Sequence, residues 1–210
     1  EGLKPPVKQN PKIPSSITFY DSKIDSKKST FQNNLEGDDF LNFFRCQNVK
    51  ITNSIFKNVK SDAIDSDFSN ITITENKFYF TGNDAIDLSG SNSEILKNQF
   101  FSTGDKCISI GEASKVILKD NQFNDSEIAI VVKDGSSISS SNNSFKNNKL
   151  EYVFFVKKPV YGPPVINSIT ENKKTKILKG KHTKINHLNT NDFDIEINDN
   201  VESLLYGREY

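Results

Sequence analysis

The chain has 210 residues and a formal net charge of zero, and 34% of its residues are hydrophobic. A neutral chain has no overall electric field that would draw it to nucleic acid or to an anionic membrane surface, so neither is an expected partner. No apolar run approaches the roughly 18 residues that indicate a membrane-spanning helix. The chain contains no methionine, even at its first position, so we expect a processed product or part of a larger protein.

Four prolines stand in the leading part of the chain, 1–16. Proline fixes one backbone angle and removes an amide donor, so this composition predicts an extended leading segment over 1–16. This segment ends where a repeating pattern begins, at Ile17.

From Ile17 onward, an apolar residue is followed seven positions later by a phenylalanine, and this pair recurs along the chain. Successive phenylalanines of the central part recur with a period of about 22 residues, and such a fixed period indicates one structural unit stacked on itself. The residues expected to stack are Phe56, Phe78, Phe100, Phe123 and Phe145.

Within a repeat, apolar and polar residues alternate, as in Ile71-Thr72-Ile73-Thr74, which is typical of a strand with one buried face. Each repeat has room for two or three strands, and its corners are rich in Asn, Ser and Gly. These features predict an all-β fold, a parallel β-helix of about six turns over 17–156. Two alternative folds fit less well. A β-sandwich does not predict the same residue types at one fixed spacing, and a propeller blade needs a repeat of about 40 residues.

Two further patterns concern the inside of the predicted coil. An asparagine stands two residues before a marker phenylalanine in four repeats: Asn76, Asn98, Asn121 and Asn143. Stacked asparagines can hydrogen-bond along the coil and satisfy backbone groups at a bend. Cys46 and Cys107 are predicted to lie three turns apart, about 14 Å at the usual strand spacing, so we expect two buried free thiols.

After Phe145 the repeat becomes less regular. Leu150–Val156 is expected to form one more strand, and Pro159 and Gly162 then interrupt the pattern. The open end of a stacked fold exposes its core and needs a cap, so we assign 157–210 to a C-terminal cap.

Charged residues recur in the stretches that start at Ser61, Asn83, Asp105 and Glu127. Aligning the repeats at the constant spacing of these stretches gives three columns. The first contains Phe40, Asp62, Asp84, Lys106 and Ile128, the second Phe43, Asp65, Asp87, Ser109 and Val131, and the third Arg45, Asp67, Ser89, Gly111 and Lys133. Strand alternation turns the second and third columns outward, where side chains of adjacent turns are about 5 Å apart.

Carboxylates this close repel one another unless a proton, a cation or a lysine intervenes, and three interpretations are open. In the first, the aspartates cap backbone amides at bends and Lys106 balances their charge. In the second, Ca²⁺ is a cofactor held by hard oxygen ligands from adjacent turns: Asp62, Asp65, Asp84 and Asp87. In the third, the same face binds or cleaves a sugar polymer, and an unpaired lysine or arginine removes the C5 proton of a metal-bound uronate.

The third interpretation names candidate residues on and beside the columns. The candidate catalytic bases are Lys106, Lys133 and Arg45. The candidate substrate-binding residues are Asp67, Ser89, Ser109, Glu112 and Asp134.

With these residues, 17–156 resembles the right-handed parallel β-helix proteins of the pectate-lyase-like superfamily. Asn83-Asp84-Ala85-Ile86-Asp87 is similar to the Asp-Asp-x-x-Asp calcium motif of family 9 polysaccharide lyases, with asparagine in place of the first aspartate. Those enzymes use a lysine base from a later turn, which Lys106 or Lys133 would supply, although neither stands at the family's spacing. Three stretches also resemble β-helix segments of bacterial proteins that carry a spore-coat-H-like kinase module: Ser61–Ser69, Gly104–Ser114 and Val132–Ser136.

The resemblance implies a right-handed coil and a bacterial, extracellular or cell-surface protein. It also implies a carbohydrate-directed module that binds or cleaves an acidic, uronate-containing polysaccharide with Ca²⁺ assistance. An enzyme of this kind would be lyase-like and would act by β-elimination. The alternative is a noncatalytic structural or surface-interaction domain of a larger bacterial protein.

Overall fold

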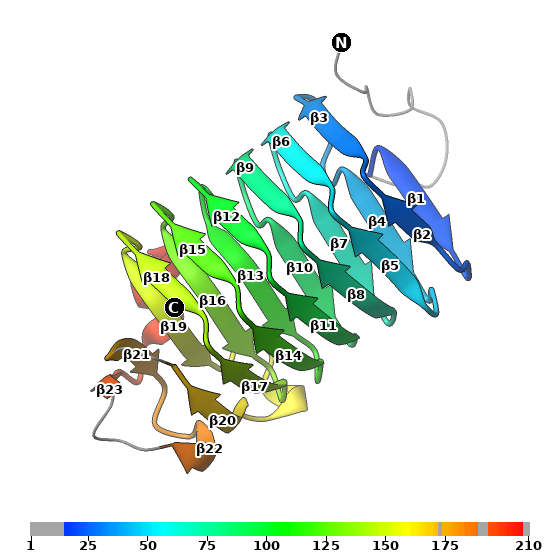
Figure 1. Cartoon of the computed structure of the whole chain (residues 1–210). Coiled ribbons are helices and arrows are strands. Elements are labelled where there is room, and N and C mark those ends of the chain that lie inside the picture. Colours follow the sequence, from blue (N-terminus) through cyan, green and yellow to red (C-terminus); the bar gives the residue numbers. More distant parts are fainter. Residues whose placement is uncertain (1–14, 172–173, 189–192, 208–210) are drawn as a thin grey trace.

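The computed structural model describes residues 15–171, 174–188 and 193–207. Its strands wind as successive turns of a coil, so that three parallel sheets run along one elongated core (Figure 1). The predicted leading segment lies outside the described residues except for Ser15 and Ser16. The described part of the chain holds no helix that is long and apolar enough to cross a membrane.

Each turn gives at most one strand to each sheet, and neighbouring strands are parallel. Sheet A comprises β1 (Ile17–Tyr20), β4 (Leu41–Phe44), β7 (Ile64–Asp67), β10 (Ile86–Ser89), β13 (Lys106–Gly111), β16 (Ile128–Lys133), β19 (Leu150–Phe155), β21 (Thr175–Lys179) and β23 (Phe193–Ile197). Sheet B comprises β2 (Asp25–Lys27), β5 (Val49–Thr52), β8 (Asn70–Thr74), β11 (Asn92–Leu96), β14 (Lys115–Lys119), β17 (Ser137–Ser141), β20 (Val165–Thr170) and β22 (Lys184–Leu188). Sheet C comprises β3 (Thr30–Asn34), β6 (Ile55–Val59), β9 (Lys77–Thr81), β12 (Gln99–Phe101), β15 (Gln122–Asn124) and β18 (Ser144–Lys146). Two short helices follow, η1 (Pro159–Tyr161) and α1 (Val201–Tyr206).

The core confirms the predicted phenylalanine stack. The rings of Phe78 and Phe100 lie 4.9 Å apart between centroids and are inclined by only 8°. The same parallel stacking joins all five predicted residues, with centroid separations of 4.8 to 5.2 Å. Each ring therefore covers the next, and four of the five residues are fully buried.

The predicted asparagine ladder is also confirmed. The Oδ1 atom of Asn98 accepts the backbone N–H of Asn76 at 2.9 Å, and its Nδ2 donates to the carbonyl of Ile73 at 2.8 Å. Asn76 and Asn121 make the equivalent bonds, each to the turn that precedes its own. The ladder satisfies backbone groups that a bend would otherwise bury without partners. Cys46 and Cys107 are free and buried, as expected.

The coil has about eight turns, not the six that the sequence predicts. The marker phenylalanine belongs to sheet C, and in the described residues that sheet ends at β18, whereas sheets A and B continue into β23 and β22. Strands therefore continue past residue 156, into the segment assigned to a cap. Beyond them, α1 packs Val201 and Leu205 on the outer face of sheet A against Val153.

The predicted columns need one correction, in the turn of β4. Asn42 pairs with Asp65, and Phe44 pairs with Asp67. The sequence separation between paired residues of β4 and β7 is therefore one residue longer than the repeat predicts. The reason is the connection from Phe44 to Val49, which is one residue longer than the equivalent connection from Asp67 to Ile71. A slip of one residue turns a side chain to the other face of a strand. Phe43 accordingly points into the core, and Arg45 lies beyond the end of β4.

Candidate functional site

Five aspartates from two adjacent turns gather on the outer face of sheet A. We call them the acidic row: Asp62, Asp65, Asp67, Asp84 and Asp87. Asp65, Asp67 and Asp87 face outward because Ile64 and Ile86 occupy the inward positions of β7 and β10, whereas Asp62 and Asp84 are buried at the bends that lead into these strands. Parallel pairing places Asp65 directly beside Asp87, at a strand spacing of about 4.8 Å. The structure thus places the four predicted calcium ligands and Asp67 in two adjacent turns.

Part of the acidic row is occupied by hydrogen bonds that stabilise the fold. Asp62 Oδ1 accepts the backbone N–H of Asp84 at 2.8 Å and the side-chain amide of Asn83 at 2.7 Å. Asn42 Nδ2 donates to Asp65 Oδ2 at 2.7 Å and to Asp67 Oδ2 at 3.3 Å. Asp62 therefore has the bend-capping role of the first interpretation.

Burial and neighbouring carboxylates raise the pKa values of four members of the acidic row, Asp62, Asp65, Asp67 and Asp84. Burial and the nearby Asp67 carboxylate raise the pKa of Asp65 to about 9. Burial, followed by Asp87, raises the pKa of Asp62 to about 7. Burial raises the pKa of Asp84, and the attraction of Lys106 opposes that rise. Asp62 and Asp65 therefore take up protons near neutral pH unless a cation compensates their charge.

The row offers oxygen ligands to Ca²⁺ without forming a complete metal site. Within the described ranges, no group of three or more His, Cys, Asp or Glu side chains is placed to hold a metal ion. Asp87 Oδ1 is buried and lacks a hydrogen-bond partner in the same part of the chain. Carboxylate oxygens suit Ca²⁺, which takes six to eight oxygen ligands, so an ion here would need further oxygens from a ligand or from water.

Lys106 is held by ion pairs at the end of the acidic row. Its Nζ lies 3.2 Å from Asp84 Oδ1 and also contacts Asp105 Oδ2. The Tyr206 ring lies over the ammonium group, 5.5 Å from its centroid. Burial alone would lower the pKa of Lys106, but the attraction of Asp84 and Asp105 prevails and raises it above its usual value. A lysine that holds its proton this firmly balances charge and is poorly suited to act as a base.

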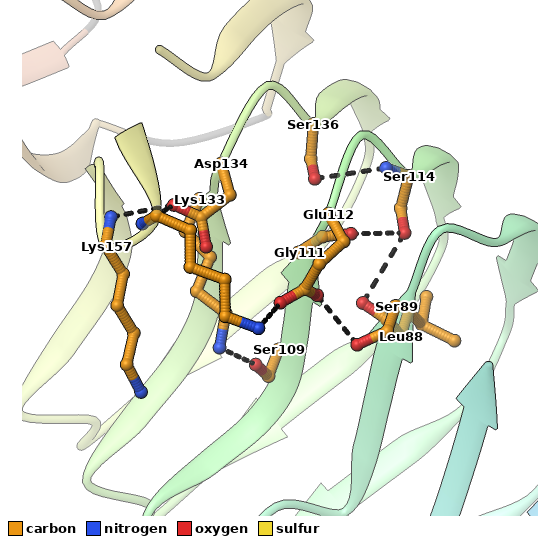
Figure 2. A network of polar contacts seen from close by, with 11 residues as sticks. Leu88, Ser89, Ser109, Gly111, Glu112, Ser114, Lys133, Asp134, Ser136 and Lys157 are labelled. Carbon is orange, nitrogen blue, oxygen red and sulfur yellow. Dashed lines mark hydrogen bonds and ion pairs between the residues drawn. The ribbon is translucent and has the colours of Figure 1, made fainter. Parts of the chain in front are cut away.

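Lys133 is placed differently, within the group of polar side chains that Figure 2 shows. From β16 its Nζ reaches back to Ser109 on β13 and donates to Oγ at 3.1 Å. Gly111 makes this path possible, because a Cβ there would lie 3.0 Å from Lys133 Cε. Lys133 is buried, and it forms no salt bridge with the residues that the structure describes. Its ammonium thus retains donor capacity toward a ligand.

The remaining predicted site residues fall into two groups. Ser89 Oγ donates to Glu112 Oε2 at 2.7 Å, and Glu112 also pairs with Lys158, so both lie beside Lys133 in the network of Figure 2. Asp134 is fully buried, and its Oδ1 accepts the backbone N–H groups of Lys157 and Lys158, which fixes the chain after β19.

Arg45 is not brought into this network. It lies three strands from β13 in sheet A, and its guanidinium stacks over the Phe44 ring at 5.3 Å. Asn42 was not among the predicted site residues, because the columns were aligned with an offset between turns that is one residue too short here. The longer offset places Asn42 beside Asp65. Sequence reasoning also missed Tyr206, because nothing in the repeat indicates that the last helix folds back over Lys106.

A family model described as a right handed beta helix region matches residues 15–170. The chain belongs to this right handed beta helix family. The match confirms the predicted resemblance to right-handed β-helix proteins, whereas the narrower likenesses to family 9 lyases and to kinase-associated segments stay predictions. No curated protein and no solved structure matches the chain. The family description specifies a fold, so the function of this β-helix has to be argued from its site.

Proposed function

We propose that the outer face of sheet A binds an acidic polysaccharide, with Ca²⁺ bridging the acidic row and the carboxylates of the polymer. The observation that carries this proposal is the parallel register that sets Asp65 directly beside Asp87 on the outer face, with Asp67 two residues further along β7. Burial first, and then the neighbouring carboxylates, raise the pKa values of Asp65 and Asp62, so the folded protein holds these groups in their charged form at a cost. A divalent cation would offset that charge without protonating the carboxylates.

Two features support a polymer as the ligand. One outward column of sheet A contains, on five successive strands, Phe44, Asp67, Ser89, Gly111 and Lys133. Its groups repeat at the strand spacing of about 4.8 Å, which offers a row of equally spaced contacts along the coil. The column also changes sign, from carboxylates in β7 to the ammonium of Lys133 in β16.

This change of sign supports an acidic polymer. Lys133 can take one uronate carboxylate directly, because its ammonium is bound only to Ser109 among the described residues. Near Asp65 and Asp87, a second uronate would complete the oxygen shell of a Ca²⁺ ion. If the module also cleaves the polymer, Lys133 is the better candidate base, because the ion pairs of Lys106 keep it protonated. Such a ligand would be met outside the cell or at its surface.

One observation favours the alternative, a noncatalytic structural or surface-interaction domain. Asp62 and Asp84 both bind backbone amides of the neighbouring turn, which suffices to explain why aspartate stands at these bends. In that case the raised pKa values would be a cost of the fold and would not indicate a ligand.

A glycan array with and without Ca²⁺ tests the proposal. We expect retention of uronate polymers in Ca²⁺, and loss of retention with chelator or in the double variant Asp65→Asn/Asp87→Asn. The matched control is Asp194→Asn, at an exposed position of β23. Uronate polymers that bind should then be incubated with the protein and monitored for an unsaturated product by ultraviolet absorbance, which appears only if β-elimination occurs. Silence across the array, with and without Ca²⁺, would favour the alternative.

A further inference from the structure

Two exposed aromatic side chains and a half-buried ring between them lie toward the N-terminal end of the same face, next to the acidic row. We call Tyr20, Phe44 and Phe68 the aromatic strip. Tyr20 is 60% exposed and Phe68 is 52% exposed. The Tyr20 and Phe44 rings stack with centroids 5.8 Å apart, and Phe68 meets Phe44 edge to face at 6.1 Å. Large aromatic groups are seldom left this exposed in a group unless the surface has a ligand.

The aromatic strip is continuous with the acidic row. Tyr20 pairs with Phe44, and Phe44 pairs with Asp67, so the three residues occupy successive positions of one outward column. Asn42 connects the two regions, because it lies on β4 beside Phe44 and donates to Asp65 and Asp67 on β7. A ligand seated on the rings would therefore meet hydrogen-bonding groups within one strand spacing.

Contacts hold the rings of the aromatic strip in place. Phe68 has a left-handed backbone conformation, with φ of 50°, and its ring lies against Gly90 of the next turn. A Cβ at Gly90 would lie 2.6 Å from Phe68 Cδ1, so only glycine leaves room for this ring position. On the other side, the Arg45 guanidinium lies over the Phe44 ring. A surface that is ordered in advance loses less conformational entropy when it binds.

The neighbourhood of the rings identifies the chemistry of the occupant. A stable protein partner covers about 800 Å² on each side, and it would have to bury the carboxylates of Asp65 and Asp67 together with three rings. An anionic lipid surface would be repelled by the same carboxylates. A sugar ring suits both the aromatic rings and the polar groups around them. Its C–H face packs on an aromatic ring, while its hydroxyls bond to adjacent carboxylate, amide and guanidinium groups.

We propose that the aromatic strip is a sugar-stacking subsite, which takes the uncharged face of a sugar residue at one end of the polysaccharide site. This inference rests on the proposed function and adds a direction to it. The polymer would lie along the coil axis, across the strands of sheet A, with one end on Tyr20, Phe44 and Phe68. Its carboxylates would then reach the acidic row and Lys133 in later turns.

The test is calorimetric titration of the whole chain with two sets of oligosaccharides of increasing length, one neutral and one uronate-containing, each with and without Ca²⁺. The variants are Phe68→Ala and Tyr20→Ala. The control is Phe80→Ala, because Phe80 is 57% exposed and has the same left-handed conformation, with φ of 56°, but lies on β9 of sheet C. Melting curves establish that each variant is folded. We expect Phe68→Ala and Tyr20→Ala to weaken binding roughly tenfold and Phe80→Ala to leave it unchanged.

The outcomes separate this inference from the proposed function. If uronates bind equally well to wild type and Phe68→Ala, the stacking subsite is refuted and the proposed function stands. If neutral oligosaccharides bind through Phe68 without any dependence on Ca²⁺, Asp65 or Asp87, the subsite stands and the proposed function is refuted. If no oligosaccharide of either set binds to the wild-type chain, both are refuted.

Discussion

Replacing Asp65 by asparagine should make this protein more stable at neutral pH, although the substitution removes a residue from the candidate site. Burial and the neighbouring carboxylates raise the pKa of Asp65 from its ordinary value of 3.8 to about 9. The folded state therefore binds the proton more tightly than the unfolded state, and stability falls as the pH rises from about 4 toward about 9. Asparagine has nearly the shape of the protonated acid and can still accept the hydrogen bond from Asn42.

The size of the effect follows from the pKa difference. One pKa unit corresponds to about 1.4 kcal/mol, so the upper limit of the gain for Asp65→Asn at pH 7 is about 4 kcal/mol. Partial exposure and proton sharing with the rest of the acidic row reduce this to about 2–4 kcal/mol. At pH 4 the gain should be close to zero, because the carboxyl group is then largely protonated in the folded state at little cost.

Thermal unfolding of wild type, Asp65→Asn and the exposed control Asp194→Asn, followed by circular dichroism from pH 4 to pH 9, provides the measurement. For a chain of this size we expect Asp65→Asn to raise the melting temperature by about 5–12 °C at pH 7, with a gain that shrinks as the pH falls. The reasoning is refuted if Asp65→Asn is less stable than wild type at pH 7, or if its gain does not change with pH.

Three further predictions concern the core, the metal and the polar network. Phe100→Ala should reduce the free energy of unfolding by about 3–5 kcal/mol, because the ring is buried between Phe78 and Phe123; a loss below about 1 kcal/mol in urea titrations would contradict the stack. Millimolar Ca²⁺ should raise the melting temperature of the wild type and not of Asp87→Asn, since binding to the folded state stabilises it; flat calorimetric titrations of the wild type would refute the metal hypothesis. Gly111→Ala should displace Lys133 from Ser109 and weaken uronate binding. Ala113→Gly, in the bend directly after β13, should leave binding unchanged. Unchanged affinity in Gly111→Ala would show that the position of Lys133 is unimportant for binding.

The interior of the coil could be predicted from the sequence because its interactions repeat. Parallel turns of nearly equal length place equivalent residues on top of one another, so the nearly constant spacing was enough to predict the stack through Phe100 and the asparagine ladder through Asn98. The same regularity identified the outward carboxylates Asp65 and Asp87 as neighbours. These contacts depend only on period and alternation, which are properties of the sequence itself.

Tertiary structure decided everything that departs from the period. One extra residue between Phe44 and Val49 shifted the register, which put Asn42 beside Asp65 and moved Arg45 away from the site. The coil continues past residue 156 in sheets A and B, whereas sheet C, which contains the marker phenylalanine, ends at β18 in the described residues. The chain also folded back, so that Tyr206 covers Lys106, whose ion pairs with Asp84 and Asp105 keep it protonated. Protonation depends on burial and on charges from other turns, and a one-dimensional pattern contains neither.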